Sequence, residues 1–211
     1  MEAPHSRLLS AAAKAHLAPI GLLRKGRSRT WIADHGWYLI VVEFQPSGFS
    51  KGSYLNVGAH FLWQWSGSLS FDLGYRVDQF VRYNSDAQFQ IESERLAIHA
   101  VTEIQRLRDQ LPGPGAVPSA LPPDPEGMAG WPTYHRAVSL GLTGETDDAS
   151  RLFQGLLEPS ENYEWIVARA KKCQGLLKLL FDRPAFQDAI MQLIKGQRQA
   201  LRLPSIPDPF M

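Results

Sequence analysis

The amino-acid sequence predicts an α+β fold, in which an antiparallel sheet is covered by helices on one face and is followed by a small all-helical unit. Residues 30–65 contain runs in which apolar and polar side chains alternate, as they do in strands. Residues 91–111 and most of 133–201 instead repeat apolar residues every three or four positions, as helices do. Between these regions, residues 112–132 hold seven prolines and four glycines, which interrupt both patterns.

The first predicted domain covers residues 1–111. It begins with an alanine- and leucine-rich helix over Ser6–Leu17, which ends before Pro19 because proline disfavours helical backbone in the preceding residue. Aromatic and β-branched runs separated by turn-forming residues then indicate strands joined by hairpins. The predicted strands are Thr30–Ile32, Trp37–Phe44, Ser53–Trp65 and Arg76–Val81. A helix over Ile91–Leu111 follows, and the two helices are expected to cover one face of the sheet.

Residues 112–132 are predicted to form a linker, because no apolar periodicity supports a buried element there. Residues 133–211 are predicted to form a unit of about four helices. These helices are Tyr134–Leu140, Asp147–Leu157, Glu161–Phe181 and Ala185–Leu201, with Pro159 and Ser160 marking the boundary between the second and the third. Residues 137–157 have the sequence pattern of one tetratricopeptide-type helical pair, present in a single copy.

Composition excludes several classes of protein. A single cysteine, Cys173, rules out an internal disulfide and a cysteine-rich zinc site, and a reducing compartment fits best. Charged residues interrupt the N-terminal apolar residues, so no signal peptide is predicted, and no run of roughly 18 apolar residues predicts a membrane span. We therefore expect a cytoplasmic protein without membrane contact, metal or cofactor.

Charge is balanced overall but not locally. The net charge of +1 gives no general reason to expect nucleic acid as a partner. Residues 124–164 nevertheless hold eight acidic residues against two arginines, a net charge of −6, and residues 165–203 hold eight basic residues against two aspartates, a net charge of +6. Helices of opposite charge attract each other within the unit or offer a partner two differently charged surfaces.

Three runs of residues carry a resemblance to a known family. They are Gly21–Trp31 (GLLRKGRSRTW), Val41–Ser47 (VVEFQPS) and Tyr54–Gly58 (YLNVG). Over residues 8–111 the chain resembles a bacterial domain family of unknown function, in which a helix precedes a Gly-aromatic-basic-Lys-Gly-Arg segment, an aromatic-Gln-x-Ser strand end and an Asn-containing strand. Leu22 stands here in place of the usual aromatic residue. The resemblance implies an α+β architecture and a bacterial, cytoplasmic setting, and it implies no activity.

The densest cluster of charge in the first domain lies between a turn and a strand. It consists of Arg24, Lys25, Arg27 and Arg29. The plainest interpretation is a solvated basic turn. Guanidinium groups also chelate phosphates and carboxylates, so a phosphorylated ligand, a nucleic acid and an acidic protein remain alternative partners. Trp31 and Trp37 are near enough to stack on bases, but tryptophans of a small sheet more often fill its core.

Neutral polar residues at the strand ends form a second candidate site. Gln45, Ser47 and Asn56 offer hydrogen-bond donors and acceptors without an obvious nucleophile. His60, on the same predicted strand face as Asn56, is the one nearby candidate for a general base. The alternative is that these side chains satisfy backbone groups of turns.

The remaining candidates give weaker signals. His99 and Glu103 have the spacing of two metal ligands on one helix face, but two ligands are too few, and a hydrogen-bonded pair is the favoured interpretation. Cys173 lies in an apolar stripe and is expected to be an inert, buried thiol. No nucleophile elbow, phosphate-binding glycine loop, dinucleotide fingerprint or zinc-protease motif is present.

The leading functional hypothesis is a non-enzymatic protein-binding or regulatory module, for example a toxin-neutralising partner, with the helical unit as the docking platform. The first alternative is recognition of nucleic acid or a phosphorylated ligand through residues 24–29. The second is an enzyme of unrecognised class that uses His60, Asn56 and Ser47, which requires these three side chains to meet in one cleft.

Overall fold

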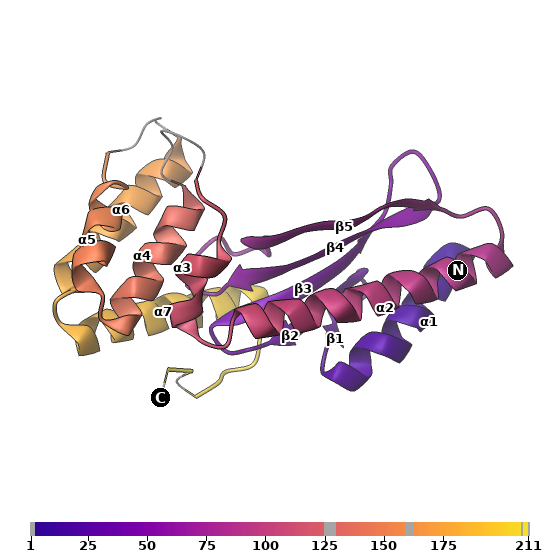
Figure 1. The fold of residues 1–211 in the computed structure, drawn as a ribbon, viewed down its shortest axis with the longest axis horizontal. Helices are drawn as coiled ribbons and strands as arrows, with labels where there is room; N and C mark the ends of the chain where they lie inside the picture. Colours follow the sequence, from indigo (N-terminus) through magenta and orange to yellow (C-terminus); the bar gives the residue numbers. More distant parts are fainter. Residues whose placement is uncertain (1–2, 125–129, 159–162, 208, 211) are drawn as a thin grey trace. The chain divides into compact units, whose positions relative to one another are not determined.

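A computed structural model describes residues 3–124, 130–158, 163–207 and 209–210. The chain divides into two compact units (Figure 1). Unit 1 contains Met1–His60 and Leu69–Asp109, and unit 2 contains Phe61–Ser68 and Gln110–Met211. The predicted α+β class is confirmed, because a five-stranded antiparallel sheet is followed by helices. Unit 2, however, includes Phe61–Ser68, eight residues from within the region predicted to form one continuous domain.

The strands lie side by side in the order in which they follow along the chain. They are β1 (Leu23–Arg24), β2 (Thr30–Asp34), β3 (Tyr38–Gln45), β4 (Gly52–Phe61) and β5 (Leu73–Arg82). The register pairs Trp31 with Val42, and Asn56 with Arg76. The strand predicted to reach Trp65 ends at Phe61, where the chain turns and leaves the sheet.

Helices α1 (Pro4–Leu17) and α2 (Asp86–Gln110) cover one face of the sheet, as predicted (Figure 1). Asp78 on β5, which pairs with Leu55, contacts Arg95 and His99 of α2, so this side of the strands faces the helix. The predicted apolar face of β4 is fully buried at Leu55, Val57 and Ala59. Trp31 and Trp37 are each only 5% exposed, which confirms that they fill the core.

Unit 2 is built mainly from helices. They are α3 (Val117–Ala120), α4 (Trp131–Thr143), α5 (Thr146–Gln154), α6 (Glu164–Leu179) and α7 (Arg183–Leu201). Asp182 caps α7 by accepting a hydrogen bond from the backbone N–H of Ala185. The predicted boundary residues Pro159 and Ser160, and the predicted helix start at Glu161, lie outside the described residues.

The first half of the segment predicted as a linker is a packed part of unit 2. Pro114–Ala116 forms a 3-10 turn that leads into α3, and Val117 is fully buried. The hydroxyl of Ser139 on α4 donates to the carbonyl of Pro114 at 2.6 Å, and Arg136 donates to the carbonyl of Leu121 at 3.0 Å. The prolines are compatible with this structure because they stand in the first positions of helical turns, where no backbone N–H is needed.

Candidate functional site

The basic segment forms the turn between β1 and β2. Nε of Arg24 donates to the carbonyl of Ser28 at 2.7 Å, and Nη2 donates to the carbonyl of Arg27 at 3.2 Å. Arg29 donates to the carbonyl of Gly52 and to the hydroxyl of Ser6. Two of the four predicted cations therefore stabilise the local fold, and Lys25 and Arg27 are left exposed.

Gln45 and Asn56 come together on the face of the sheet opposite α2. The Asn56 amide donates to the side-chain oxygens of Glu43 and Gln45, each at 3.0 Å. Arg76 of β5 joins them, donating to Gln45 at 2.8 Å and to Asn56 at 3.3 Å. Convergence of Gln45 and Asn56 is one of the two alternatives that the sequence left open, the less favoured one. The part taken by Arg76 was missed, because a pairing across β4 and β5 is not readable from the residues alone.

Ser47 and His60 do not join this network. The Ser47 hydroxyl accepts a hydrogen bond from the backbone N–H of Phe49 at 3.1 Å, which is the turn-stabilising alternative. His60 shares a face of β4 with Asn56, as predicted, but it is fully buried and its partners are Ser70 and Asp72, so the expectation of an available general base beside Asn56 is corrected. An enzyme built on His60, Asn56 and Ser47 is therefore not supported.

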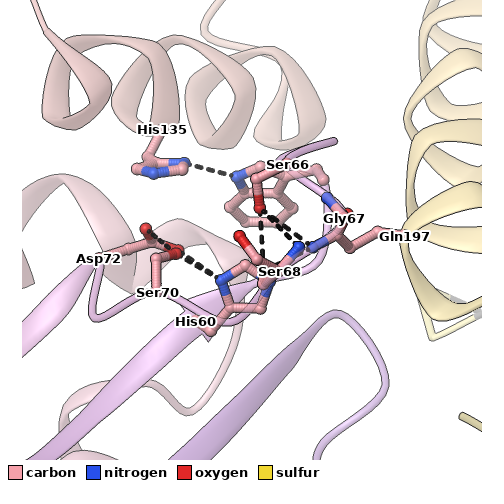
Figure 2. Close-up of polar contacts among 9 residues, drawn as sticks. His60, Ser66, Gly67, Ser68, Ser70, Asp72, His135 and Gln197 are labelled. Carbon is pink, nitrogen blue, oxygen red and sulfur yellow. Dashed lines mark hydrogen bonds and ion pairs between the residues drawn. The ribbon is translucent and has the colours of Figure 1, made fainter. Parts of the chain in front are cut away.

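The His60 cluster does not have the geometry of a hydrolytic triad. Figure 2 shows the imidazole directed at Ser70 and Asp72. Nδ1 of His60 lies 2.7 Å from the Ser70 hydroxyl and 3.2 Å from the Asp72 carboxylate, and Ser70 donates to Asp72 at 2.8 Å. In a triad the serine and the carboxylate occupy opposite ring nitrogens, whereas here they share one. The cluster therefore joins the end of β4 to the segment that precedes β5.

The pair predicted at His99 and Glu103 is also corrected. His99 contacts Asp78 at 2.9 Å, and Glu103 accepts from Arg106 at 2.7 Å, so each residue has a different partner. Across the part of the chain that the structure describes, no group of three or more His, Cys, Asp or Glu side chains has the arrangement of a metal site. Cys173 is buried, as predicted, and burial raises the pKa of its thiol to about 12.

Hydrogen bonds from α4 and α7 hold residues 61–68 within unit 2. The indole N–H of Trp63 donates to Nδ1 of His135 at 2.9 Å, and both side chains are fully buried. The Gln197 amide accepts from the backbone N–H of Gly67 and donates to the carbonyl of Ser68 (Figure 2). The hydrogen bonds made by Gln197 have one signal in the sequence, because Gln197 is a polar residue on the otherwise apolar face of α7.

A groove of about 590 Å³ between α6 and α7 combines an apolar floor with positive charge. It is lined by Trp65, Ala168, Lys171, Lys172, Gly175, Leu176, Leu179, Ala189 and Leu193. Two lysines and no acidic side chain contribute to the lining. The groove was missed from the sequence, where its only signal is the set of small residues Ala168, Gly175 and Ala189 on the two facing helices.

Aromatic residues and cations alternate beside the groove. Nζ of Lys172 lies 5.9 Å from the ring centre of Trp65. The guanidinium of Arg169 lies 5.4 Å from the ring centre of Trp165 and 5.7 Å from that of Trp131. Trp165 remains half exposed. These cation–π contacts keep positive charge and aromatic surface together along the first turns of α6.

Comparison with known proteins provides no relative. The chain matches no protein-family model, no curated protein and no solved structure. The resemblance of residues 8–111 to a bacterial domain family therefore stays a prediction. Within the described residues, no helix is both long enough and apolar enough to cross a membrane.

Proposed function

We propose that this protein is a non-enzymatic protein-binding module, and that the groove between α6 and α7 receives an amphipathic helix rich in acidic residues. The observation that carries the proposal is the lining of the groove, in which Leu176, Leu179 and Leu193 supply apolar surface while Lys171 and Lys172 supply positive charge. This combination matches a partner that is apolar on one side and negatively charged beside it.

The dimensions of the groove suit a helix. From Ala168 to Leu179 it follows α6 for about 16 Å, at a rise of 1.5 Å per residue, which corresponds to about three helical turns. Gly175 and Ala189 lie on opposite walls, and their small size lets a third backbone approach closely. No atom lies within 4 Å of the position that a Cβ on Gly175 would occupy, so space is open there.

The surroundings of the groove favour a protein partner. Val167 is 47% exposed and Phe181 is 71% exposed, which extends the apolar surface beyond the groove itself. Residues 165–203 carry a net charge of +6, which favours an acidic partner over a basic one. The candidates Gln45, Ser47, Asn56 and His60 of unit 1, in contrast, are engaged in local hydrogen bonds and do not meet in one catalytic cluster.

Steric blocking of the groove tests the proposal. A displayed library of 16-residue helical peptides is selected on the full-length protein, and binding of the selected peptides is measured against Gly175→Leu. We expect the selected peptides to be enriched in Leu, Phe, Asp and Glu, and Gly175→Leu to weaken their binding at least tenfold. Gly196→Leu is the matched control, because Gly196 is also a helical glycine with open space around it but does not line the groove.

Charge reversal tests the electrostatic half of the proposal. Lys171→Glu combined with Lys172→Glu is expected to weaken the selected acidic peptides about tenfold or more, whereas Lys178→Glu combined with Lys195→Glu, which lie outside the lining, changes binding less. Selection that yields no peptide, or peptides that bind Gly175→Leu as tightly as the wild type, refutes the proposal. Binding to anionic vesicles through the same lysines, without peptide binding, assigns the groove to a membrane surface instead.

A further inference from the structure

The loops at one end of the unit 1 sheet carry unpaired positive charge. The β1–β2 turn, the β3–β4 loop and the end of β5 lie at this same end, because Arg29 bonds to Gly52 and Gly52 pairs with Arg82. Four exposed cations gather there: Lys25, Arg27, Lys51 and Arg82. Within the described residues, no ion pair joins any of them to a carboxylate. We call this cluster the cationic end of the sheet.

Two further arginines of the sheet have no carboxylate partner among the described residues: Arg24, next to the β1–β2 turn, and Arg76, farther along β5 where it pairs with Asn56. Arg24 donates to the backbone carbonyls of Arg27 and Ser28, and Arg76 donates to the side-chain oxygens of Gln45 and Asn56. All these acceptors are neutral, so the hydrogen bonds fix the guanidinium groups without neutralising them. The one carboxylate in the Arg76 network, Glu43, accepts from the amide of Asn56. The local charge is therefore positive although the chain as a whole is nearly neutral.

Aromatic rings lie among these cations on the sheet face opposite α2. The guanidinium of Arg76 lies 4.0 Å from the ring centre of Tyr54, and the ring of Phe80 lies 5.0 Å from that of Tyr54. Phe49, in the β3–β4 loop, is fully exposed at 101%. A large apolar side chain held entirely in water beside a cationic surface is a feature that packing within the chain does not explain.

We propose that the cationic end of the sheet binds single-stranded nucleic acid. Phosphates contact Lys25, Arg27, Lys51 and Arg82, and bases stack on Phe49 and on the Arg76–Tyr54 pair. Unpaired bases stack on flat guanidinium and aromatic faces. In proteins that bind single strands, a row of positively charged side chains contacts the phosphate backbone. A duplex is not the expected ligand, because its bases offer no free faces to these rings. The inference is independent of the groove in unit 2.

Binding is measured by fluorescence anisotropy with labelled 12-nucleotide oligo(dT) and oligo(U), and the two strands show whether DNA or RNA is preferred. Four phosphate contacts predict that log K falls with log salt with a slope of about −3, so that affinity drops about 50-fold between 50 and 200 mM salt. Lys51→Ala combined with Arg82→Ala is expected to halve this slope. Lys178→Ala combined with Lys195→Ala removes the same charge from unit 2 and is expected to leave binding unchanged.

The contribution of stacking is tested at Phe49. Phe49→Leu keeps the charge and an apolar side chain but removes the ring, and because Phe49 is fully exposed the fold does not depend on it. We expect at least a fivefold loss of affinity for the oligonucleotides. Equal binding by Phe49→Leu together with equal competition by heparin identifies general attraction to polyanions and overturns the proposal. Binding of a mononucleotide as tightly as of the 12-mer also overturns it, in favour of a small phosphorylated ligand.

Discussion

Substitution of Gly141 by alanine tests how closely α4 and α7 approach within unit 2. A Cβ at residue 141 would lie 2.6 Å from two ring atoms of Phe186 on α7 and 2.9 Å from Cδ1 of Leu180. Both neighbours are buried, Phe186 completely and Leu180 to within 1% exposure, so neither ring nor methyl group has free space to move into. Gly141→Ala therefore forces a shift between packed elements.

Two opposing effects determine how much Gly141→Ala changes the free energy of unfolding. Alanine stabilises a helix by about 1 kcal/mol relative to glycine, because it restricts the unfolded backbone. Overpacking of a well-filled core costs about 1–3 kcal/mol. We therefore expect Gly141→Ala to lower the free energy of unfolding by about 1 kcal/mol. Gly175→Ala, with no atom within 4 Å of the new methyl group, raises it by up to about 1 kcal/mol.

Urea unfolding followed by tryptophan fluorescence measures both variants, since Trp63, Trp65, Trp131 and Trp165 all belong to unit 2. The expected difference between the two alanine variants is about 2 kcal/mol. Adding Phe186→Leu to Gly141→Ala is expected to cost less than Phe186→Leu costs alone, because the smaller side chain relieves the clash. A Gly141→Ala protein as stable as Gly175→Ala would falsify the close packing of α4 against α7.

Three further predictions concern buried and titrating groups. His135→Phe leaves the buried indole N–H of Trp63 without its acceptor and is expected to lower the free energy of unfolding by about 1–3 kcal/mol in urea, whereas His135→Asn, whose oxygen can replace Nδ1, loses less. Because burial raises the pKa of Cys173 to about 12, iodoacetamide at pH 8 is expected to alkylate it only after unfolding in urea, and rapid alkylation of the native protein contradicts its burial. Burial, reinforced by the charge of Arg108, lowers the pKa of His35 below its usual 6.5. The unfolded chain therefore binds a proton at His35 more tightly than the folded protein does. The contribution of His35 to folding stability is present above pH 6.5 and is lost as pH falls through the pKa of the folded state. Unfolding at pH 7.5 and 5.5 is expected to show this loss, and His35→Gln is expected to reduce it; an unchanged pH dependence in the variant counts against the assignment.

The sheet was predictable because side chains in strands alternate with a fixed period. Leu55, Val57 and Ala59 had to share one face, and that face had to be buried. The same rule correctly places Asn56 and His60 on one side of β4. The rule does not say which part of this side of the strand is covered by other residues. Ser70 and Asp72 contact His60, which is buried, although its place in the alternation predicts a solvent-exposed side chain.

The candidate sites were less predictable because they depend on contacts between distant residues. The four cations from Arg24 to Arg29 look equivalent in the sequence, yet the turn geometry gives Arg24 two carbonyl acceptors and leaves Lys25 exposed. Similarly, Gly175 and Ala189 become the walls of a groove only when α6 lies against α7. Proline content misled the interpretation of residues 114–121, because a proline that opens a helical turn and a proline in a linker look alike in the sequence.

The excursion of Phe61–Ser68 into unit 2 has a consequence for synthesis of the chain. Trp63 leaves the ribosome 72 residues ahead of His135, and Gly67 leaves it 130 residues ahead of Gln197. At about 5–20 residues per second, this apolar segment stays without its final neighbours for roughly 6 to 26 seconds. The nascent chain therefore exposes the apolar segment Phe61–Ser68 until α7 has been synthesised. Slow translation between residues 69 and 201 lengthens the time in which this segment can bind other proteins.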